Sequence, residues 1–302
     1  MSEVKEAKSI FFLGKGGVGK STSSALTALA LAEKGFRTQL VSMDPAHNQG
    51  DIFERKLSDK FTKVQENLWV KEVSIDQGVK QYLEGIQKQV KRSYSYLTAF
   101  NLEHYLDILK FSPGIEEYAL MTAYLNIRKE AANMDFIIFD MPPTALTLKF
   151  FTLPDVSLLW LKNLLMLRNK IIEKKEIIAR VKLGKKELDT DKIRSNLEKQ
   201  IADYEAIKSV FADKSKTALH LVINPDKLSF SESQLIIEKL KPYDIAISRL
   251  VLNKWKKDSP LDEIKQSYKV DAMQLFPISD SPLLGIEALR QYLKNLAGFL
   301  DL

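Results

Sequence analysis

The stretch Gly14-Lys-Gly-Gly-Val-Gly-Lys-Ser21 follows directly on the apolar run Ser9-Ile-Phe-Phe-Leu13. Two nucleotide-binding motifs fit this loop. Gly14, Gly16 and Gly19 form G-x-G-x-x-G, which is typical of dinucleotide-binding oxidoreductases. The whole stretch also forms G-x-x-x-x-G-K-S, the P-loop, in which backbone N–H groups surround phosphates at the positive end of a helix. The loop therefore indicates a nucleotide site and leaves its chemistry open.

The P-loop interpretation gives a role to more of these residues. Lys20 would reach the β- and γ-phosphates, and Ser21 would bind Mg²⁺. The dinucleotide interpretation uses neither side chain, although it does predict an acidic residue at the end of the second strand, where Asp44 lies. The run Phe136-Ile-Ile-Phe-Asp140 separates the two, because a P-loop NTPase needs a carboxylate near its metal ion at the end of a buried strand. Together these motifs favour a P-loop NTPase.

An additional lysine, Lys15, stands near the tip of the loop, where an ordinary P-loop has none. Such a lysine could carry its charge to the nucleotide of a second subunit, as an arginine finger does in trans. The alternative is a surface lysine without a role in the reaction. Its place inside the loop favours the first interpretation.

Short β-rich runs alternate with longer helical patterns along much of the chain. This alternation predicts an α/β fold with a mostly parallel sheet and helices on both faces, as in a P-loop NTPase. The predicted strands are 10–13, 38–43, 69–73, 136–139, 218–223, 247–252 and 272–276. The predicted helices are 20–34, 231–240 and 283–300. The last of these carries apolar residues on one face and lacks a basic face, so it is expected to pack in the core.

Two further segments, 77–132 and 155–215, are helical in pattern and show no convincing strand. They are expected to form one all-helical subdomain inserted into a P-loop ATPase domain made of 1–76, 133–154 and 216–302. An apolar stripe runs from Leu158 to Ile172, and it is wide for a helix with one face in water. Packing within the subdomain is the favoured interpretation, and a groove for a hydrophobic partner helix is the alternative.

The composition excludes several classes of protein. The 302 residues include no cysteine, which rules out disulfides, thiolate zinc sites and cysteine-bound iron–sulfur clusters. The apolar run Val156–Leu167 is interrupted by Lys162 and is too short to span a bilayer, so a cytoplasmic protein is expected. The net charge of +6 lies entirely in 162–216. A solvated helix surface explains it most simply; contact with lipid headgroups or an acidic partner is the alternative, and no pattern points to nucleic acid.

Several motifs together resemble the ArsA/Get family, the arsenite-pump ATPase and the tail-anchored-protein targeting ATPase. The loop resembles the deviant Walker A that this family shares with MinD, ParA and the nitrogenase iron protein. Asp44-Pro-Ala-His-Asn48 is similar to the family's first switch, and Asp140 to Lys149 to its second. Pro113-Gly-Ile-Glu-Glu117, Val251-Leu-Asn253, Pro277 and Gly285 to Arg290 resemble further family motifs in the right order.

The resemblance implies roles for matching residues. Lys15 would cross a dimer interface, Asp44 would orient or deprotonate the attacking water, and Ser21 and Asp140, the latter through a water, would hold Mg²⁺. Asn253 would recognise adenine, with backbone near Pro277 closing the pocket. The residues expected around the phosphates of ATP are Gly14, Lys15, Gly16, Gly17, Val18, Gly19, Lys20, Ser21 and Thr22, with Thr22 on the α-phosphate. The three histidines, His47, His104 and His220, show no ligand spacing.

The second switch departs from the family pattern, Thr-Ala-Pro-Thr-Gly-His-Thr-Leu-Arg after the aspartate. Five positions differ, and the loss of glycine and histidine there is expected to alter how the nucleotide state reaches the helical part. These positions are Met141, Pro142, Ala145, Leu146 and Lys149. The chain also lacks the cysteines with which family members bind metalloid or clamp zinc between subunits. A homodimer held by nucleotide contacts is therefore expected.

Three functions stay open at this stage. The first is an ATPase whose opening and closing dimer carries hydrophobic membrane-anchor helices. The second is a subunit that drives a pump by docking on a membrane transporter. The third is a MinD- or ParA-type positioning ATPase, which the segment 44–48 disfavours. A nitrogenase-like electron carrier is excluded by the missing cysteines.

Overall fold

The computed structural model describes residues 6–93, 112, 114–183, 191–257, 259, 261–268 and 272–296. An eight-stranded sheet with the order β3-β4-β2-β5-β1-β6-β7-β8 forms its centre. The strands are β1 (Lys8–Leu13), β2 (Thr38–Ser42), β3 (Thr62–Gln65), β4 (Leu68–Glu72), β5 (Phe136–Asp140), β6 (Thr217–Ile223), β7 (Arg249–Trp255) and β8 (Met273–Pro277). Every neighbouring pair is parallel except β3–β4. The predicted α/β fold with a mostly parallel sheet is confirmed.

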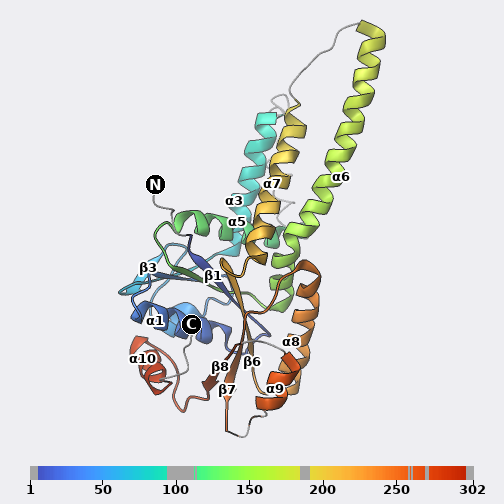
Figure 1. Cartoon of the computed structure of the whole chain (residues 1–302). Helices are drawn as coiled ribbons and strands as arrows, with labels where there is room; N and C mark the ends of the chain where they lie inside the picture. Colours follow the sequence, from blue (N-terminus) through green and yellow to red (C-terminus); the bar gives the residue numbers. More distant parts are fainter. Residues whose placement is uncertain are drawn as a thin grey trace.

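Helices lie between most consecutive strands of the chain (Figure 1). They are α1 (Lys20–Glu33), α2 (Gln49–Phe53), α3 (Ile75–Ser93), α5 (Ile115–Glu130), α6 (Thr144–Leu183), α7 (Lys192–Ala212), α8 (Lys227–Leu240), the 3-10 helix η2 (Lys241–Tyr243), α9 (Leu261–Tyr268) and α10 (Ile286–Asn295). Sequence reasoning missed β3, α2 and α9, which are all short. Strand β3 reads Thr-Lys-Val-Gln, and only Val64 is buried, so this edge strand has almost no apolar pattern to reveal it.

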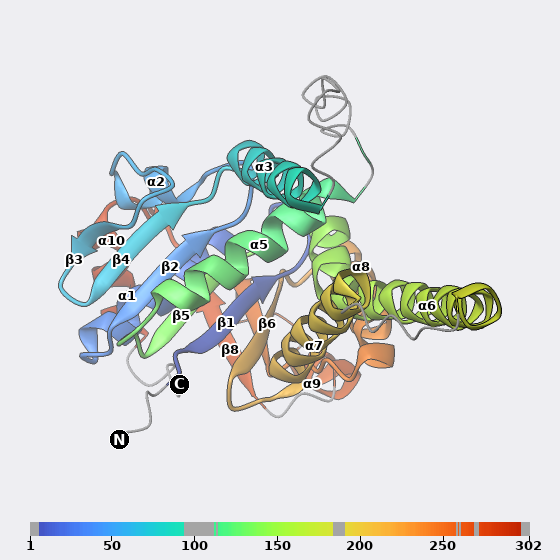
Figure 2. The same cartoon turned by 90° about the horizontal axis from the view of Figure 1, so that it is seen from above.

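Alternate residues of each central strand point to opposite faces, and each face has its own core. On β1, Phe11 and Leu13 belong to one apolar cluster, whereas Ile10 and Phe12 belong to the other. The first cluster is covered by α5, α7, α8, α9 and the start of α6, and the second by α1, α2 and α10. Figure 2 shows α5 lying across the strands with α1 and α10 behind them. Both faces of the sheet are thus buried, which explains the continuously apolar strands.

Aromatic side chains of α5, α6 and α7 pack against the face of the sheet that carries Phe11. Phe11 stacks on Phe139 with ring centroids 4.8 Å apart, and Tyr124 of α5 meets Phe139 edge-on at 5.4 Å. Phe150 of α6 and Phe211 of α7 join the same cluster, with their centroids 5.6 Å apart. Aromatic pairs of this kind contribute about 0.5–1.5 kcal/mol each beyond their buried area. Helices α6 and α7 therefore pack on the sheet at their sheet-proximal ends, and α5 packs on it through Tyr124 in its middle.

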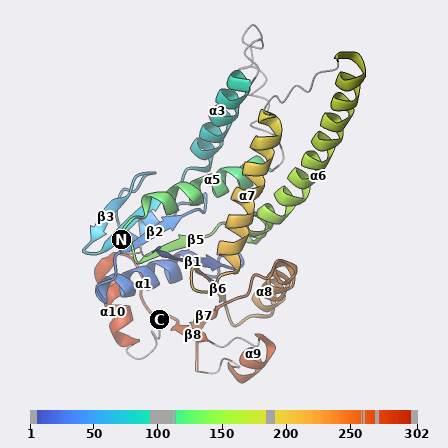
Figure 3. The ribbon, with the colours of Figure 1, turned by 45° about the horizontal axis from the view of Figure 1, so that its top comes forward.

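Helices α3, α6 and α7 extend beyond the sheet on one side (Figure 3). Helix α6 has 40 residues, which corresponds to a length of about 60 Å. It begins in the segment expected to belong to the ATPase domain and runs without a break past residue 154 into the segment expected to be the helical subdomain. The division into two domains stays a prediction, but a single helix joins its two parts.

Part of α6 passes a composition test for a membrane span. Within the described residues, Thr144–Lys174 is the one stretch long and apolar enough to cross a bilayer, with a mean hydropathy of 1.3. However, Phe150 and Phe151 of this stretch are fully buried in the core of the sheet domain. Its first turns are therefore core, and its apolar composition alone is weak support for a membrane span.

The last predicted helix is shorter than expected. Helix α10 covers Ile286–Asn295 instead of 283–300, and Leu300 lies outside the described residues. Leu289 is fully buried against α1 and the sheet, with Leu293 and Leu296 beside it. Its apolar face therefore packs in the core, as predicted.

Candidate functional site

The loop between β1 and α1 has a backbone shape that requires glycine at two close approaches. Gly14 has φ +147°, and a Cβ atom there would lie 2.3 Å from the backbone oxygen of Val222 in β6. Gly19 has φ +94°, and a Cβ atom would lie 2.2 Å from Nδ2 of Asn253 in β7. An L side chain at either position would be strained in its backbone and would clash. These glycines let the loop lie against the ends of the two neighbouring strands.

Lys20 is the first residue of α1, and it is buried although it carries a charge. Its Nζ donates to the backbone oxygen of Lys15, 3.3 Å away, so the lysine folds back over the loop. Gly19 provides no side-chain cap, and no acidic residue lies in the first turn of α1. The first amides of the helix and the Lys20 ammonium therefore offer positive charge to an anion at this point.

A cleft of about 510 Å³ opens beside this helix end. Residues of the loop, of the segment after β2 and of the segment after β5 line it together. They are Gly16, Gly17, Gly19, Lys20, Ser21, Thr22, Asp44, Ala46, Asn48, Asp51, Ile52 and Pro143. The cleft lies at the carboxyl ends of the parallel strands, where open α/β sheets bind their ligands. The fold thus brings together most of the residues predicted to hold phosphate.

Asp140 lies at the end of β5 and is completely buried. Its Oδ2 accepts a hydrogen bond from Nε2 of Gln49 at 3.0 Å, and the Ser21 hydroxyl also bonds to this carboxylate. Within the described residues its Oδ1 has no hydrogen-bond partner. Burial raises the pKa of Asp140 to about 6, while Ser21, Gln49 and the charge of Lys20 oppose that rise. A buried carboxylate oxygen and a serine hydroxyl form a donor set suited to Mg²⁺, so these residues fit the expected metal.

Gln49 is a site residue that sequence reasoning missed. It is the first residue of α2 and is completely buried. Besides Asp140, its Nε2 reaches the backbone oxygen of Ser21 at 3.0 Å and Oγ of Ser24 at 3.1 Å. One amide therefore joins the segment after β2, the start of α1 and the end of β5. In the sequence, the one signal for Gln49 as a site residue is its position directly after the first-switch motif at 44–48.

Asp44 follows the carboxyl end of β2 and faces the cleft while being almost buried. Its Oδ1 accepts from the backbone N–H of Ala46 at 3.0 Å, which fixes the carboxylate in a short turn. His47 in the same turn has φ +49° and is exposed. Among the described residues the other oxygen of Asp44 has no hydrogen bond, so it can contact a group in the cleft.

Six predicted residues are not among those that line the cleft in this structure: Gly14, Lys15, Val18, Asp140, Asn253 and Pro277. Asn253 donates from Nδ2 to the backbone oxygen of Val18 at 2.8 Å, behind the loop. The backbone oxygen of Pro277 accepts from the hydroxyl of Tyr292 at 2.6 Å. Lys15 is half-buried, and its contact with Lys20 is made through its backbone. The adenine role of Asn253 and Pro277 and the intersubunit role of Lys15 therefore stay predictions.

The second switch leads from the cleft into α6. Pro143 lines the cleft, and α6 begins at the next residue, Thr144, whose hydroxyl donates to Oε1 of Glu232 in α8 at 2.6 Å. One turn later Lys149 pairs with the buried Glu117 of α5 at 2.7 Å. Among the residues that depart from the family pattern, Met141 and Pro142 are buried, Leu146 is half-buried and Ala145 is exposed. The first turns of α6 are thus bound to two other helices.

The apolar stripe of α6 is expected to pack within the helical subdomain, but the structure leaves part of this helix's apolar surface exposed. Leu158 and Leu161 are buried, as that interpretation requires. Apolar residues on the opposite side are exposed, each by more than half of its surface. We call this the α6 outer face, and it consists of Val156, Leu159, Trp160, Met166 and Leu167. Their spacing of three, one, six and one residues places them on one side of a helix. Packing within the subdomain therefore explains only part of the stripe.

The histidines do not gather with other ligands. Buried His220 lies on β6 edge-on to Phe12, and His104 is outside the described residues. Within the described ranges there is no group of three or more His, Asp or Glu side chains suited to a metal ion. The oxygen pair of Ser21 and Asp140 is thus smaller than a self-sufficient metal site. A nucleotide that supplied further oxygens would complete it.

Comparison with known proteins agrees with this geometry. The family model for "Anion-transporting ATPase" matches residues 7–297. A protein of Aquifex aeolicus named as an arsenical pump-driving ATPase is 30% identical over 95% of this chain and 98% of its own length. An ATPase ASNA1 homolog of Cryptosporidium parvum is 31% identical over 92% of this chain and 74% of its own, and ATPase GET3C of Arabidopsis thaliana is 28% identical over 84% and 68%. The chain therefore belongs to the anion-transporting ATPase family, as its resemblance to ArsA and Get proteins indicated.

Proposed function

We propose that the protein hydrolyses ATP with Mg²⁺ in the cleft beside α1. The observation that carries this proposal is the convergence of Lys20, Ser21, Thr22 and Asp44 on one cleft at the carboxyl ends of the strands. The amides of the loop and the Lys20 ammonium hold the β- and γ-phosphates, and Thr22 contacts the α-phosphate. Asp44 orients the attacking water and accepts its proton.

Ser21 and Asp140 hold the metal ion, Asp140 through a water. When bound, Mg²⁺ neutralises the charge that develops on the transferred phosphoryl group. Gln49 and Ser21 support the ionised form of Asp140 by donating hydrogen bonds to it. Asn253 reaches the adenine edge after leaving the Val18 carbonyl, and backbone near Pro277 closes the base pocket.

We further propose that the active form is a cytoplasmic homodimer. Lys15 lies in the exposed part of the loop next to Gly16 and Gly17, which are both exposed. From there its ammonium reaches the nucleotide of the other subunit, as an arginine finger would. Replacing Lys15 with Ala then slows hydrolysis much more than it weakens ATP binding. Equal effects on both would argue against the intersubunit role.

Hydrolysis controls the helical part through α6. Loss of the γ-phosphate changes the contacts at Pro143, and the helix that starts at Thr144 transmits this change over its whole length. The α6 outer face then alternates between an exposed and a covered state. Its chemistry suits a hydrophobic membrane-anchor helix, because a large exposed apolar face on a soluble protein marks an interaction site. Peripheral contact with the membrane follows from delivery of such a client.

A second candidate is a subunit that drives a transporter, favoured by the name of the Aquifex aeolicus relative. The α6 outer face would then dock on a membrane partner and would carry no client. This chain contains no cysteine, so activation by thiolate-bound metalloid does not operate in it.

The hydrolysis proposal is tested by replacing Asp44 with Asn. We expect kcat to fall by about a hundredfold or more while ATP binding is kept, since general base catalysis contributes on that scale. Asp51→Asn is a matched control, because Asp51 lines the same cleft without an assigned role. Turnover that survives Asp44→Asn would remove Asp44 from the mechanism.

The client proposal is tested by co-expression with a tagged protein that ends in one C-terminal transmembrane helix. We expect the Asp44→Asn form to retain this client in a soluble complex that the wild type releases to membranes. Leu159→Asp is expected to abolish capture, whereas Leu228→Asp, at an equally exposed leucine of α8, is not. Intact ATPase activity with no client captured by either form would favour the transporter-docking alternative.

A further inference from the structure

A second cavity, of about 530 Å³, lies at the other end of the sheet. It is bounded by Ala7 and Ile137, which lie at the starts of β1 and β5, whereas the ATP cleft lies at the ends of these strands. The last turns of α5 and α7 form its other walls. Apolar side chains dominate these walls, among them Leu125, Ala131, Ile207 and Val210. A cavity of this size and character is typical of sites for small organic ligands.

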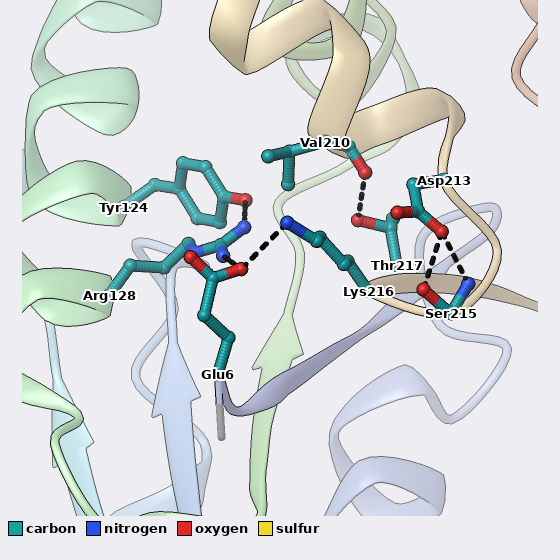
Figure 4. Close-up of polar contacts among 8 residues, drawn as sticks. All are labelled: Glu6, Tyr124, Arg128, Val210, Asp213, Ser215, Lys216 and Thr217. Atoms are coloured by element: carbon teal, nitrogen blue, oxygen red, sulfur yellow. Dashed lines mark hydrogen bonds and ion pairs between the residues drawn. The ribbon is translucent and has the colours of Figure 1, made fainter. Parts of the chain in front are cut away.

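A cluster of charges stands at this cavity (Figure 4). Oε2 of Glu6 lies 3.3 Å from Nη2 of Arg128 and 3.0 Å from Nζ of Lys216. Nη1 of Arg128 also donates to the hydroxyl of Tyr124 at 3.0 Å. The bond from Lys216 and the charges of both cations hold the pKa of Glu6 below its usual value, against the effect of partial burial. Two cations thus contact one carboxylate. Glu6 and Arg128 line the cavity itself, together with Lys129 and Asp203, whose charges are opposite.

We propose that this cavity binds a small carboxylic acid with an apolar tail, whose carboxylate takes the place of Glu6 between Arg128 and Lys216. The contacts of Glu6 already show that a carboxylate fits both cations. The Glu6 side chain is 58% exposed, whereas that of Arg128 is 15% exposed, so the acid can leave while the cation stays in place. Because Glu6 is exposed, solvent screens its ion pairs and displacing it costs little. Burial of the ligand's tail against the apolar walls contributes binding free energy.

Such a ligand would contact two parts of the molecule at once. Ile137 belongs to β5 and Ala7 directly precedes β1, while Arg128 and Val210 belong to α5 and α7. Any movement of these helices against the sheet changes the cavity, so ligand binding and that movement are thermodynamically linked. The binding proposal itself rests on the cavity and its charges, and it stands independently of the ATPase proposal.

The test is calorimetric titration of the full chain with octanoate, below the concentration at which octanoate forms micelles. We expect saturable binding that weakens roughly fifteenfold for hexanoate, since each buried methylene contributes about fourfold in affinity. Glu6→Gln removes the competing charge and tightens binding about two- to fivefold. Arg128→Met weakens it about tenfold or more, because a charged hydrogen bond is lost.

Two further variants keep the result interpretable. Arg194→Met removes an exposed arginine of α7 that pairs with Glu198 away from the cavity, and it should leave octanoate affinity unchanged. Ala206→Trp fills the cavity from its solvent side and should abolish binding even where Arg128→Met folds poorly. Thermal melts establish that each variant is folded.

Octanoate bound to the α6 outer face would also give a calorimetric signal. Trp160→Gln changes that face and so separates binding there from binding in the cavity. Binding that survives Trp160→Gln and is lost in Ala206→Trp supports the cavity. Binding lost in Trp160→Gln and kept in Ala206→Trp overturns the proposal. The proposal is also overturned by equal affinity for octanol, which lacks the carboxylate, or by no saturable binding in the wild type and Glu6→Gln.

Discussion

We predict that low pH lowers the unfolding free energy of the protein through one buried histidine of the sheet, His220. His220 lies on β6 with its ring 5.0 Å from that of Phe12, and it is almost completely buried. Within the described part of the chain its Nδ1 has no hydrogen-bond partner. Burial lowers the pKa of His220 to about 3, and the charges of Arg249 and Lys8 act in the same direction. The folded protein therefore holds this imidazole neutral.

The sign and size of the effect follow from this shift. The folded-state pKa is depressed, so the neutral ring contributes stability that is fully present above the unfolded pKa and is lost as the pH falls toward the folded one. With values of 6.5 unfolded and about 3 folded, lowering the pH from 7 to 5 should remove about 2 kcal/mol of unfolding free energy through this residue alone.

The assay is urea unfolding of the wild type, His220→Phe and His220→Gln at pH 7 and pH 5. Neither variant can titrate there, so each should lose about 2 kcal/mol less than the wild type between the two pH values. Subtracting the variant's loss of unfolding free energy between the two pH values from that of the wild type removes the contribution of all other titrating groups. It also removes any packing cost of the substitution, because that cost is the same at both pH values. The same loss in all three proteins would refute the assignment of acid sensitivity to His220.

Substitutions test three further contacts, those of Gly14, Gln49 and Lys149. Gly14→Ala should lower the unfolding free energy by about 2 kcal/mol or more, since its Cβ meets backbone of β6, whereas Gly16→Ala, which meets nothing within 4 Å, should be tolerated in urea unfolding. Gln49→Leu should cost about 1–3 kcal/mol and raise the Mg²⁺ concentration needed for tight nucleotide binding, with unchanged Mg²⁺ dependence as the contrary result. Lys149→Met leaves buried Glu117 without its ion pair, so thermal unfolding should occur at a lower temperature, while Lys149→Arg should restore it.

The phosphate end of the site was predictable because its chemistry is local in sequence. The loop needs glycines at fixed offsets, and Lys20 and Ser21 directly follow the last of them. Asp140 was predictable because a fully buried strand has a continuously apolar pattern that ends where the chain leaves the sheet. In each case one segment carries both the structural signal and the candidate functional residue.

Other features depend on contacts between distant segments, and sequence patterns do not report these. Gln49 meets Asp140 across 91 positions, and Asn253 meets the backbone of Val18 across 235. The short elements β3 and α2 were not predicted for a related reason, because they have too few residues to show a hydrophobic period. The predicted wide stripe of α6 was correct as a pattern, yet only the packing of α7 reveals which side stays exposed.

Helix α6 gains its properties from having different surroundings at its two ends. Near its start, Phe150 and Phe151 are buried, so this end is fixed in the core beside the cleft proposed to bind ATP. Further along, Leu159 and Trp160 are 69% and 66% exposed. Leaving such side chains in water forfeits about 1.5–3 kcal/mol each relative to full burial, and a partner that covered this face would recover part of that free energy. Because one helix, with Pro154 inside it, connects the buried end to the exposed face, a change in the cleft at Pro143 can reach that face through α6.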